Sequence, residues 1–331
     1  MLPIDPDDAL ARLMEFQRTV RDALIAARSK QALNEVAHES SADTIYRIDA
    51  EVDPLLEAFC EEWGRTTPLV LVAEGIVDEH GHEGPLVFPR DTREEDALVR
   101  LIVDPIDGTR MIMYDKRSAW ALAGLAPNKG AGTRLSDIEV ACMTELPTSK
   151  QGYADVLTAI KGRGTHARRF DLKSGASSDL PIAPSSATTI AHGFAAVANF
   201  FPGTKQLASE LMERIALELV GPPDVGRAMV FDDQYITTGG QMYELVIGHD
   251  RFVADLRSLF YAKQDLGAGL CVHPYDCAAW LVAAEAGVIL TDGLGNPLDG
   301  PLDCTTNLSW AGFANRTLFE RIQPVIRAFF G

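Results

Sequence analysis

The sequence is poor in cysteine and has no closely paired cysteines. Its five cysteines stand singly, and no two of them form a CxxC pair. An odd number of scattered thiols excludes a disulfide framework as the basis of the fold and argues against a thiolate zinc site. The first ten residues, MLPIDPDDAL, also lack the basic and apolar stretches of a secretory signal. We therefore expect a reduced, cytoplasmic protein.

Long apolar runs and surplus positive charge are missing as well. No stretch approaches the roughly 20 consecutive apolar residues of a membrane helix, so we expect no membrane partner. The 331 residues carry a formal net charge of −17. Nucleic-acid binders usually present a basic face, so nucleic acid is not an expected partner. The main basic run, KGRGTHARR at 161–169, is interpreted as a solvated loop because of its glycines.

Helical and strand patterns follow one another without a regular βαβ rhythm, which favours a layered, mixed α+β fold. A Ser-, Pro- and Ala-rich stretch at 170–190 predicts a boundary between two subdomains. We place the N-terminal subdomain at 1–175 and the C-terminal one at 185–331. The predicted strands are 69–73, 98–103, 118–126, 137–145, 251–257 and 288–292, and the predicted helices are 5–28, 48–63, 204–219, 240–247, 275–287 and 316–329.

The stretch LIVDPIDGTR at 101–110 places two aspartates three residues apart after an apolar strand. The predicted strand ends at Asp104, where side chains reach the rim of a sheet. Two carboxylates this close repel each other unless a cation lies between them or one is protonated. Magnesium prefers such oxygen ligands, and Asp104, the Ile106 carbonyl and Asp107 could supply three. The alternative is an ordinary turn in which Asp104 caps a helix.

The residues after this pair suggest an anion site. Gly108 permits backbone close to a ligand, and Thr109 begins a possible short helix whose amides would bind phosphate. Carboxylates suited to a metal beside an anion-binding turn point to metal-assisted phosphoryl hydrolysis.

The string DPIDGT at 104–109 resembles the signature of the inositol monophosphatase superfamily. These are magnesium-dependent, often lithium-sensitive phosphatases that include fructose-1,6-bisphosphatases and phosphoadenosine-phosphate phosphatases. Three more segments resemble the family in the same order, and the resemblance spans roughly 40–315. They are DTIYRID at 43–49, LVAEG at 71–75 and HPYDCAAWLVAAEAGVILTD at 273–292.

The resemblance implies a fold, a reaction and a set of site residues. The fold is a layered α/β/α/β/α sandwich with the site between two subdomains. The reaction is hydrolysis of a small phosphorylated metabolite by metal-activated water, and the protein is expected to be a homo-oligomer. Two or three Mg²⁺ ions would be held by Glu74, Asp104, the Ile106 carbonyl, Asp107 and Asp276.

Other roles also come from the resemblance. Thr109 would hydrogen-bond the attacking water together with Glu74 or Asp49, while Gly108 and Thr109 would bind phosphate. Each acidic residue has an alternative role, because Asp49 and Asp276 could cap helices and Glu74 could be a lone loop carboxylate.

The chain departs from the family pattern at three points. Gly75 stands where many members have a second glutamate, and Arg110 begins a run that differs from that of inositol phosphatases. Tyr46 stands where the family has a threonine three residues before Asp49. The first difference leaves a non-catalytic, metal- or metabolite-binding relative as an alternative function. Surface charges and an unliganded helix start explain the candidate substrate contacts equally well. These candidates are Arg110, Lys116, Arg117, Gly239 and Gly240.

Overall fold

The structure is a computed structural model that describes residues 1–28, 36–39, 44–75, 84–267 and 269–331, with only the backbone course for the parts that fall within 28–51. Two sheets of different size organise these residues. A further pair of short strands, β1 (Val36–Glu39) and β2 (Thr44–Tyr46), leads into the second helix.

The large sheet has eight strands in the spatial order β10-β9-β8-β7-β6-β5-β3-β4. Its strands pair antiparallel except β3 with β5, which run parallel. The strands are β3 (Leu69–Ala73), β4 (Leu86–Phe88), β5 (Val99–Asp107), β6 (Ala119–Pro127), β7 (Val140–Leu146), β8 (Tyr153–Ile160), β9 (Thr165–Asp171) and β10 (Ser177–Asp179).

The small sheet has four strands in the order β11-β12-β14-β13, and only its pair β11 and β12 is parallel. Among the described residues, the strands from β3 to β10 (69–179) belong to the large sheet, and the strands from residue 194 on belong to the small one. The division into subdomains at 175 and 185 stays a prediction. The strands are β11 (Phe194–Val197), β12 (Asp250–Asp255), β13 (Ile289–Thr291) and β14 (Trp310–Phe313).

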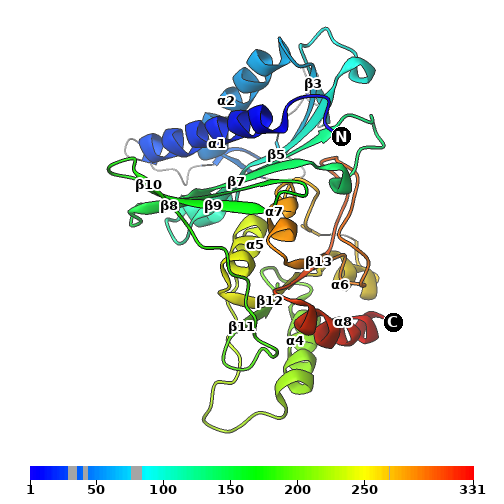
Figure 1. Ribbon diagram of the computed structural model, residues 1–331. Coiled ribbons are helices and arrows are strands. Elements are labelled where there is room, and N and C mark those ends of the chain that lie inside the picture. The colour runs from blue at the N-terminus through cyan, green and yellow to red at the C-terminus, as the bar shows by residue number, and fades with distance from the viewer. Residues whose placement is uncertain (29–35, 40–43, 76–83, 268) are drawn as a thin grey trace.

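Helices lie on both outer faces and between the two sheets, which gives the predicted α/β/α/β/α layering (Figure 1). Helices α1 and α2 cover one face of the large sheet, α5 and α7 fill the middle layer, and α4 and α8 cover the far face of the small sheet. Two shorter helices, α3 and α6, stand next to strand ends. The helices are α1 (Pro6–Arg28), α2 (Arg47–Gly64), α3 (Thr109–Met113), α4 (Lys205–Val220), α5 (Thr238–Ile247), α6 (Arg257–Lys263), α7 (Trp280–Glu285) and α8 (Arg316–Phe330).

Both faces of the large sheet are buried, and successive residues of one strand therefore enter different cores. In β5, Leu101 and Val103 pack against the α1 and α2 side, whereas Ile102 packs into the core shared with the small sheet. Because side chains alternate across a sheet, a strand covered on both faces must be apolar throughout. This explains the unbroken apolar run before Asp104.

Several of the predicted elements differ from the structure. The basic run at 161–169 is a loop only at its glycines, because β9 begins at Thr165. The helix predicted at 275–287 is shorter and begins at Trp280 after a series of turns. The strand predicted to reach residue 257 ends at Asp255, and Arg257 begins α6.

Candidate metal and phosphate site

Strand β5 carries two carboxylates on one side because it contains one extra residue. Asp104 pairs with Leu122 and Asp107 pairs with Trp120, so three steps along β5 match two steps along β6. In a regular strand, residues three apart would point to opposite faces. The irregularity is a β-bulge, which lets both aspartates face the same site. The prediction that the strand ends at Asp104 was wrong, since β5 continues to Asp107.

Asp276 joins this pair from a distant part of the chain. One oxygen from each of Asp104, Asp107 and Asp276 lies within 4.8 Å of the others. Asp276 belongs to the turns before α7, where its Oδ2 accepts the His273 amide hydrogen at 2.6 Å. It is not the cap of α7, because that helix starts at Trp280 and Ala279 holds the cap position.

Burial disfavours the ionised form of all three carboxyl groups. Burial raises the pKa of Asp104 well above its usual value, and the negative charges of Glu74, Asp107 and Asp276 raise it further. Burial also raises the pKa of Asp107 to about 6, and burial with the charge of Asp107 raises that of Asp276 to about 8. A cation bound among them would remove this penalty.

A buried arginine supplies positive charge beside the cluster. Arg257 is 7% exposed, and its Nη2 pairs with Asp255 at 2.7 Å. Its guanidinium charge lowers the pKa of Asp107 and Asp276, opposing the larger effect of burial. Sequence reasoning missed this residue, because nothing in its neighbourhood along the chain marks it as part of the site.

The structure locates only some of the remaining predicted site residues. Glu74 follows β3 directly and lies close enough for its charge to raise the pKa of Asp104. The Ile106 carbonyl accepts the Thr109 hydroxyl hydrogen at 3.0 Å, so these two predicted site groups are adjacent. The side chain of Asp49, in the first turn of α2, lies outside the described residues. The metal and water roles of these residues stay predictions.

Asp107 is held by the start of α5, which belongs to the middle layer. The Thr237 hydroxyl donates to Asp107 Oδ2 at 2.7 Å, and the Gly239 amide donates to the same oxygen at 2.5 Å. The Thr238 amide donates to Oδ1 at 3.2 Å. Such donors at a helix N-terminus stabilise a carboxylate. Sequence reasoning missed Thr237, although a threonine before two glycines and an apolar run is a helix-cap signal.

The turn after Asp107 requires glycine. Gly108 has a φ of +94°, and a Cβ at this position would lie 3.0 Å from the Thr237 Cβ. Gly108 also stands at the cap position of α3, whose first residue is Thr109. The structure thus brings the predicted phosphate-binding turn directly beside the three carboxylates.

The five residues predicted to contact substrate lie in different environments. Arg110 and Lys116 are exposed, whereas the Arg117 guanidinium pairs with Asp233 and Glu244. Gly239 and Gly240 are buried, and a Cβ on them would lie 2.5 Å from Leu122 and 2.3 Å from Tyr235. Close packing accounts for both glycines, and a contact with substrate stays a prediction for all five residues.

The donor set fits a hard cation. All the converging groups are carboxylate oxygens, which magnesium prefers over nitrogen and sulfur. Burial is the main cause of their raised pKa values, and a bound cation would favour the ionised forms of the three carboxyl groups. Asp104, Asp107 and Asp276 would hold the cation directly.

The chain was compared with known proteins by sequence and by structure. Its sequence matches no family model and no curated protein. Its structure is similar to that of fructose-1,6-bisphosphatase from Leishmania major, with a TM-score of 0.68 and 13% identity over 96% of this chain and 92% of that one. It is also similar to the extragenic suppressor protein suhB of Bartonella henselae (TM-score 0.65, 14% identity, 97% and 98% covered).

A third similar structure is the IMPase of Thermotoga maritima, with a TM-score of 0.63 and 14% identity over 98% of this chain and 100% of that one. These likenesses extend over nearly the whole of each chain, so they concern the complete arrangement of layers. The chain therefore has the fold of the inositol monophosphatase superfamily.

Proposed function

We propose that the protein is a magnesium-dependent phosphomonoesterase acting on a small phosphorylated metabolite. The observation that carries the proposal is the convergence of Asp104, Asp107 and Asp276 within 4.8 Å beside the Gly108 turn. Similar structures named as a fructose-1,6-bisphosphatase and an IMPase support it. Two or three ions, with Glu74 and the Ile106 carbonyl as further ligands, belong to the same proposal.

The chain's own residues would have different roles in the reaction. Bound Mg²⁺ would supply a Lewis acid that lowers the pKa of water and stabilises charge on the leaving oxygen. The carboxylates would fix the position of the cations, and the amides of Gly108 and Thr109 would orient the phosphate. Glu74 or Asp49 would accept a proton from the attacking water. The Thr109 oxygen, whose own hydrogen is donated to the Ile106 carbonyl, would accept a second hydrogen bond from that water.

The test is phosphate release from a panel of substrates. It would contain inositol 1-phosphate, fructose 1,6-bisphosphate, phosphoadenosine phosphate, NADP and several sugar phosphates, each with Mg²⁺, with EDTA, and with Mg²⁺ plus Li⁺. We expect Mg²⁺-dependent turnover that Li⁺ inhibits. Asp107→Asn should lower kcat/KM on the order of 100-fold or more, because even residues behind metal ligands contribute 10–100-fold. Asp179→Asn, exposed on β10, is the matched control.

Equal hydrolysis by Asp107→Asn and the unaltered protein would contradict the proposal, because it would exclude the cluster from the reaction. Silence across the panel, with Mg²⁺ binding shown by calorimetry, would favour a substrate outside the panel or the non-catalytic alternative, which the glycine at position 75 suggested.

Within the described residues, none of the helices combines the length and apolarity needed to cross a bilayer. Cytoplasmic location and homo-oligomerisation stay predictions.

A further inference from the structure

The segment before α5 is held to β11 by backbone hydrogen bonds of Phe231 and by the Gln234 side chain, and it is held to β6 by one aromatic residue. None of residues 220–234 is buried, and Tyr235 is the next buried residue along the chain. Its hydroxyl donates to the Ser118 carbonyl at 2.8 Å and accepts from the Trp120 indole at 3.0 Å. The ring thus fixes this segment to the start of β6, two residues before Thr237.

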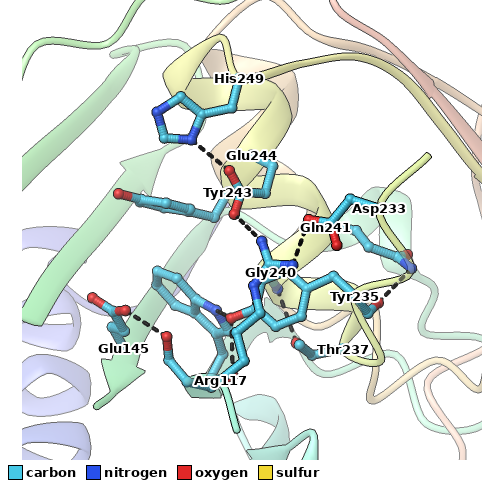
Figure 2. Close-up of polar contacts among 12 residues, drawn as sticks. Arg117, Glu145, Asp233, Tyr235, Thr237, Gly240, Gln241, Tyr243, Glu244 and His249 are labelled. Atoms are coloured by element: carbon cyan, nitrogen blue, oxygen red, sulfur yellow. Dashed lines mark hydrogen bonds and ion pairs between the residues drawn. The ribbon is translucent and has the colours of Figure 1, made fainter. Parts of the chain in front are cut away.

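The Arg117 guanidinium packs over the face of the Tyr235 ring. Its guanidinium carbon lies 3.5 Å from the centroid of Tyr235, a cation–π geometry. One nitrogen pairs with Asp233 before the ring, and the other pairs with Glu244 on α5, each at 2.5 Å (Figure 2). The planar guanidinium therefore joins β6, the anchored segment and α5 in one contact, as its fork of donors allows.

The anchored segment leads directly to the ligand Asp107. The Tyr235 carbonyl accepts a hydrogen from the Gln241 side-chain Nε2 at 2.8 Å, and the Tyr235 ring packs against Gly240. Thr237, which follows, donates to Asp107 and accepts from the Gly240 amide at 2.9 Å. Any shift of Tyr235 would move the donors that hold Asp107 in place.

We propose that Arg117 is a positioning residue for the metal site, acting through Tyr235 and Thr237 on Asp107. This inference rests on the proposed function, because it assigns Arg117 to the metal and not to the substrate. The contacts behind a metal ligand set its orientation and typically alter metal affinity 10–100-fold when removed. Arg117 itself is engaged by two carboxylates and an aromatic face, and its side chain is 31% exposed.

The experiment is Mg²⁺ titration of the full chain by calorimetry, together with hydrolysis kinetics. Arg117→Met keeps an apolar stem over Tyr235 but removes the charge, and Arg117→Lys restores the charge without the planar fork. Arg163→Met is the matched control, because Arg163 forms an exposed pair with Asp7 on the other side of the large sheet. We expect about tenfold weaker Mg²⁺ binding in Arg117→Met, a smaller loss in Arg117→Lys, and none in the control.

Kinetics separate this role from a substrate contact. At saturating Mg²⁺, Arg117→Met should keep its KM for substrate, while the Mg²⁺ concentration for half-maximal rate rises. If KM rises instead and Mg²⁺ affinity is unchanged, Arg117 contacts substrate and the positioning role is wrong. Should Arg117→Met fail to fold, Tyr235→Phe removes the bonds to Ser118 and Trp120 and should also weaken Mg²⁺ binding.

The outcomes also distinguish this inference from the proposed function. Mg²⁺ binding that weakens in the variants without any hydrolysis would support positioning and contradict the phosphatase. Hydrolysis with unchanged Mg²⁺ affinity in both Arg117→Met and Tyr235→Phe would do the reverse. A chain that binds no Mg²⁺ would overturn both.

Discussion

The Thr237 hydroxyl donates a hydrogen bond to the Asp107 carboxylate at 2.7 Å, and this contact joins the large sheet to the middle helical layer. The same hydroxyl oxygen caps α5 by accepting the Gly240 amide hydrogen. One side chain therefore serves both the helix end and the ligand.

Replacing Thr237 should affect stability and metal binding together. In Thr237→Val the cap and the bond to Asp107 are both lost, and each such loss costs about 1 kcal/mol or more. We expect a lower free energy of unfolding, by about 2 kcal/mol, and weaker Mg²⁺ binding. Urea unfolding and calorimetry measure the two effects. Thr237→Ser keeps the hydroxyl and should stay close to the unaltered protein; equal losses in both variants would show that the methyl group matters more.

The acidic cluster should make the metal-free protein less stable as pH rises. In the folded protein burial raises the pKa of Asp276 to about 8 and that of Asp107 to about 6, whereas unfolded aspartate titrates near 3.9. Between these values the folded state holds more protons than the unfolded state, so increasing pH removes stability. We expect the Tm in EDTA to fall between about pH 5 and pH 8 by several degrees.

Two additions identify the cluster as the source of that slope. Mg²⁺ should restore the Tm at pH 8, because a ligand that binds only the folded state stabilises it. Asp276→Asn should flatten the slope in EDTA, whereas Asp179→Asn should leave it unchanged. A steep slope that persists in Asp276→Asn would place its origin outside these carboxylates.

Close packing around α5 predicts a strict requirement for glycine at position 240. A Cβ there would lie 2.3 Å from the Tyr235 Cε1, a distance that forces the ring or the helix to move. Gly240→Ala should lower the free energy of unfolding by about 1–3 kcal/mol, as overpacking does. Gly152→Ala, where no atom lies within 4 Å of the added Cβ, is the control. Equal stability of the two variants in urea would refute the packing argument.

A carboxylate at the end of α7 ties down the hairpin between β8 and β9. Glu285 accepts the Gly162 amide hydrogen at Oε1 and the Gly164 amide hydrogen at Oε2, each at 2.8 Å. Glu285→Ala should cost about 1–3 kcal/mol of stability, because two amides lose a charged acceptor. Glu285→Gln retains one acceptor and should lose less. Mg²⁺ affinity should not change in either variant, and a change would connect this hairpin to the site.

The sequence predicted the elements whose apolar pattern is complete within one segment. The stripe at Leu13, Phe16, Val20 and Leu24 is buried in α1, and the residues predicted for β3 match the observed strand. The layered fold was also predicted, through the resemblance. The strand β9 was missed because its charged residues pair with the neighbouring strand, as Arg169 does with the buried Asp155 of β8.

The residues of the candidate site were also predicted only in part. Asp104, Asp107 and Asp276 were predicted as one site because their motifs resemble a known order, and the structure brings them together. Thr237, Tyr235 and Arg257 were missed because their roles arise only when distant segments pack. The sequence pattern shows what each segment could do, whereas hydrogen bonds between segments depend on the complete fold.

The bulge in β5 has a consequence for the order in which parts of the chain fold. A growing chain exposes Asp104 and Asp107 well before it contains the α5 amides or Asp276, since domains begin to fold from the N-terminal side during synthesis. Until then the two aspartates lie at the edge of the forming sheet without the hydrogen-bond donors that α5 supplies to Asp107. Docking of the later layers buries that pair and supplies the hydrogen-bond donors that hold Asp107.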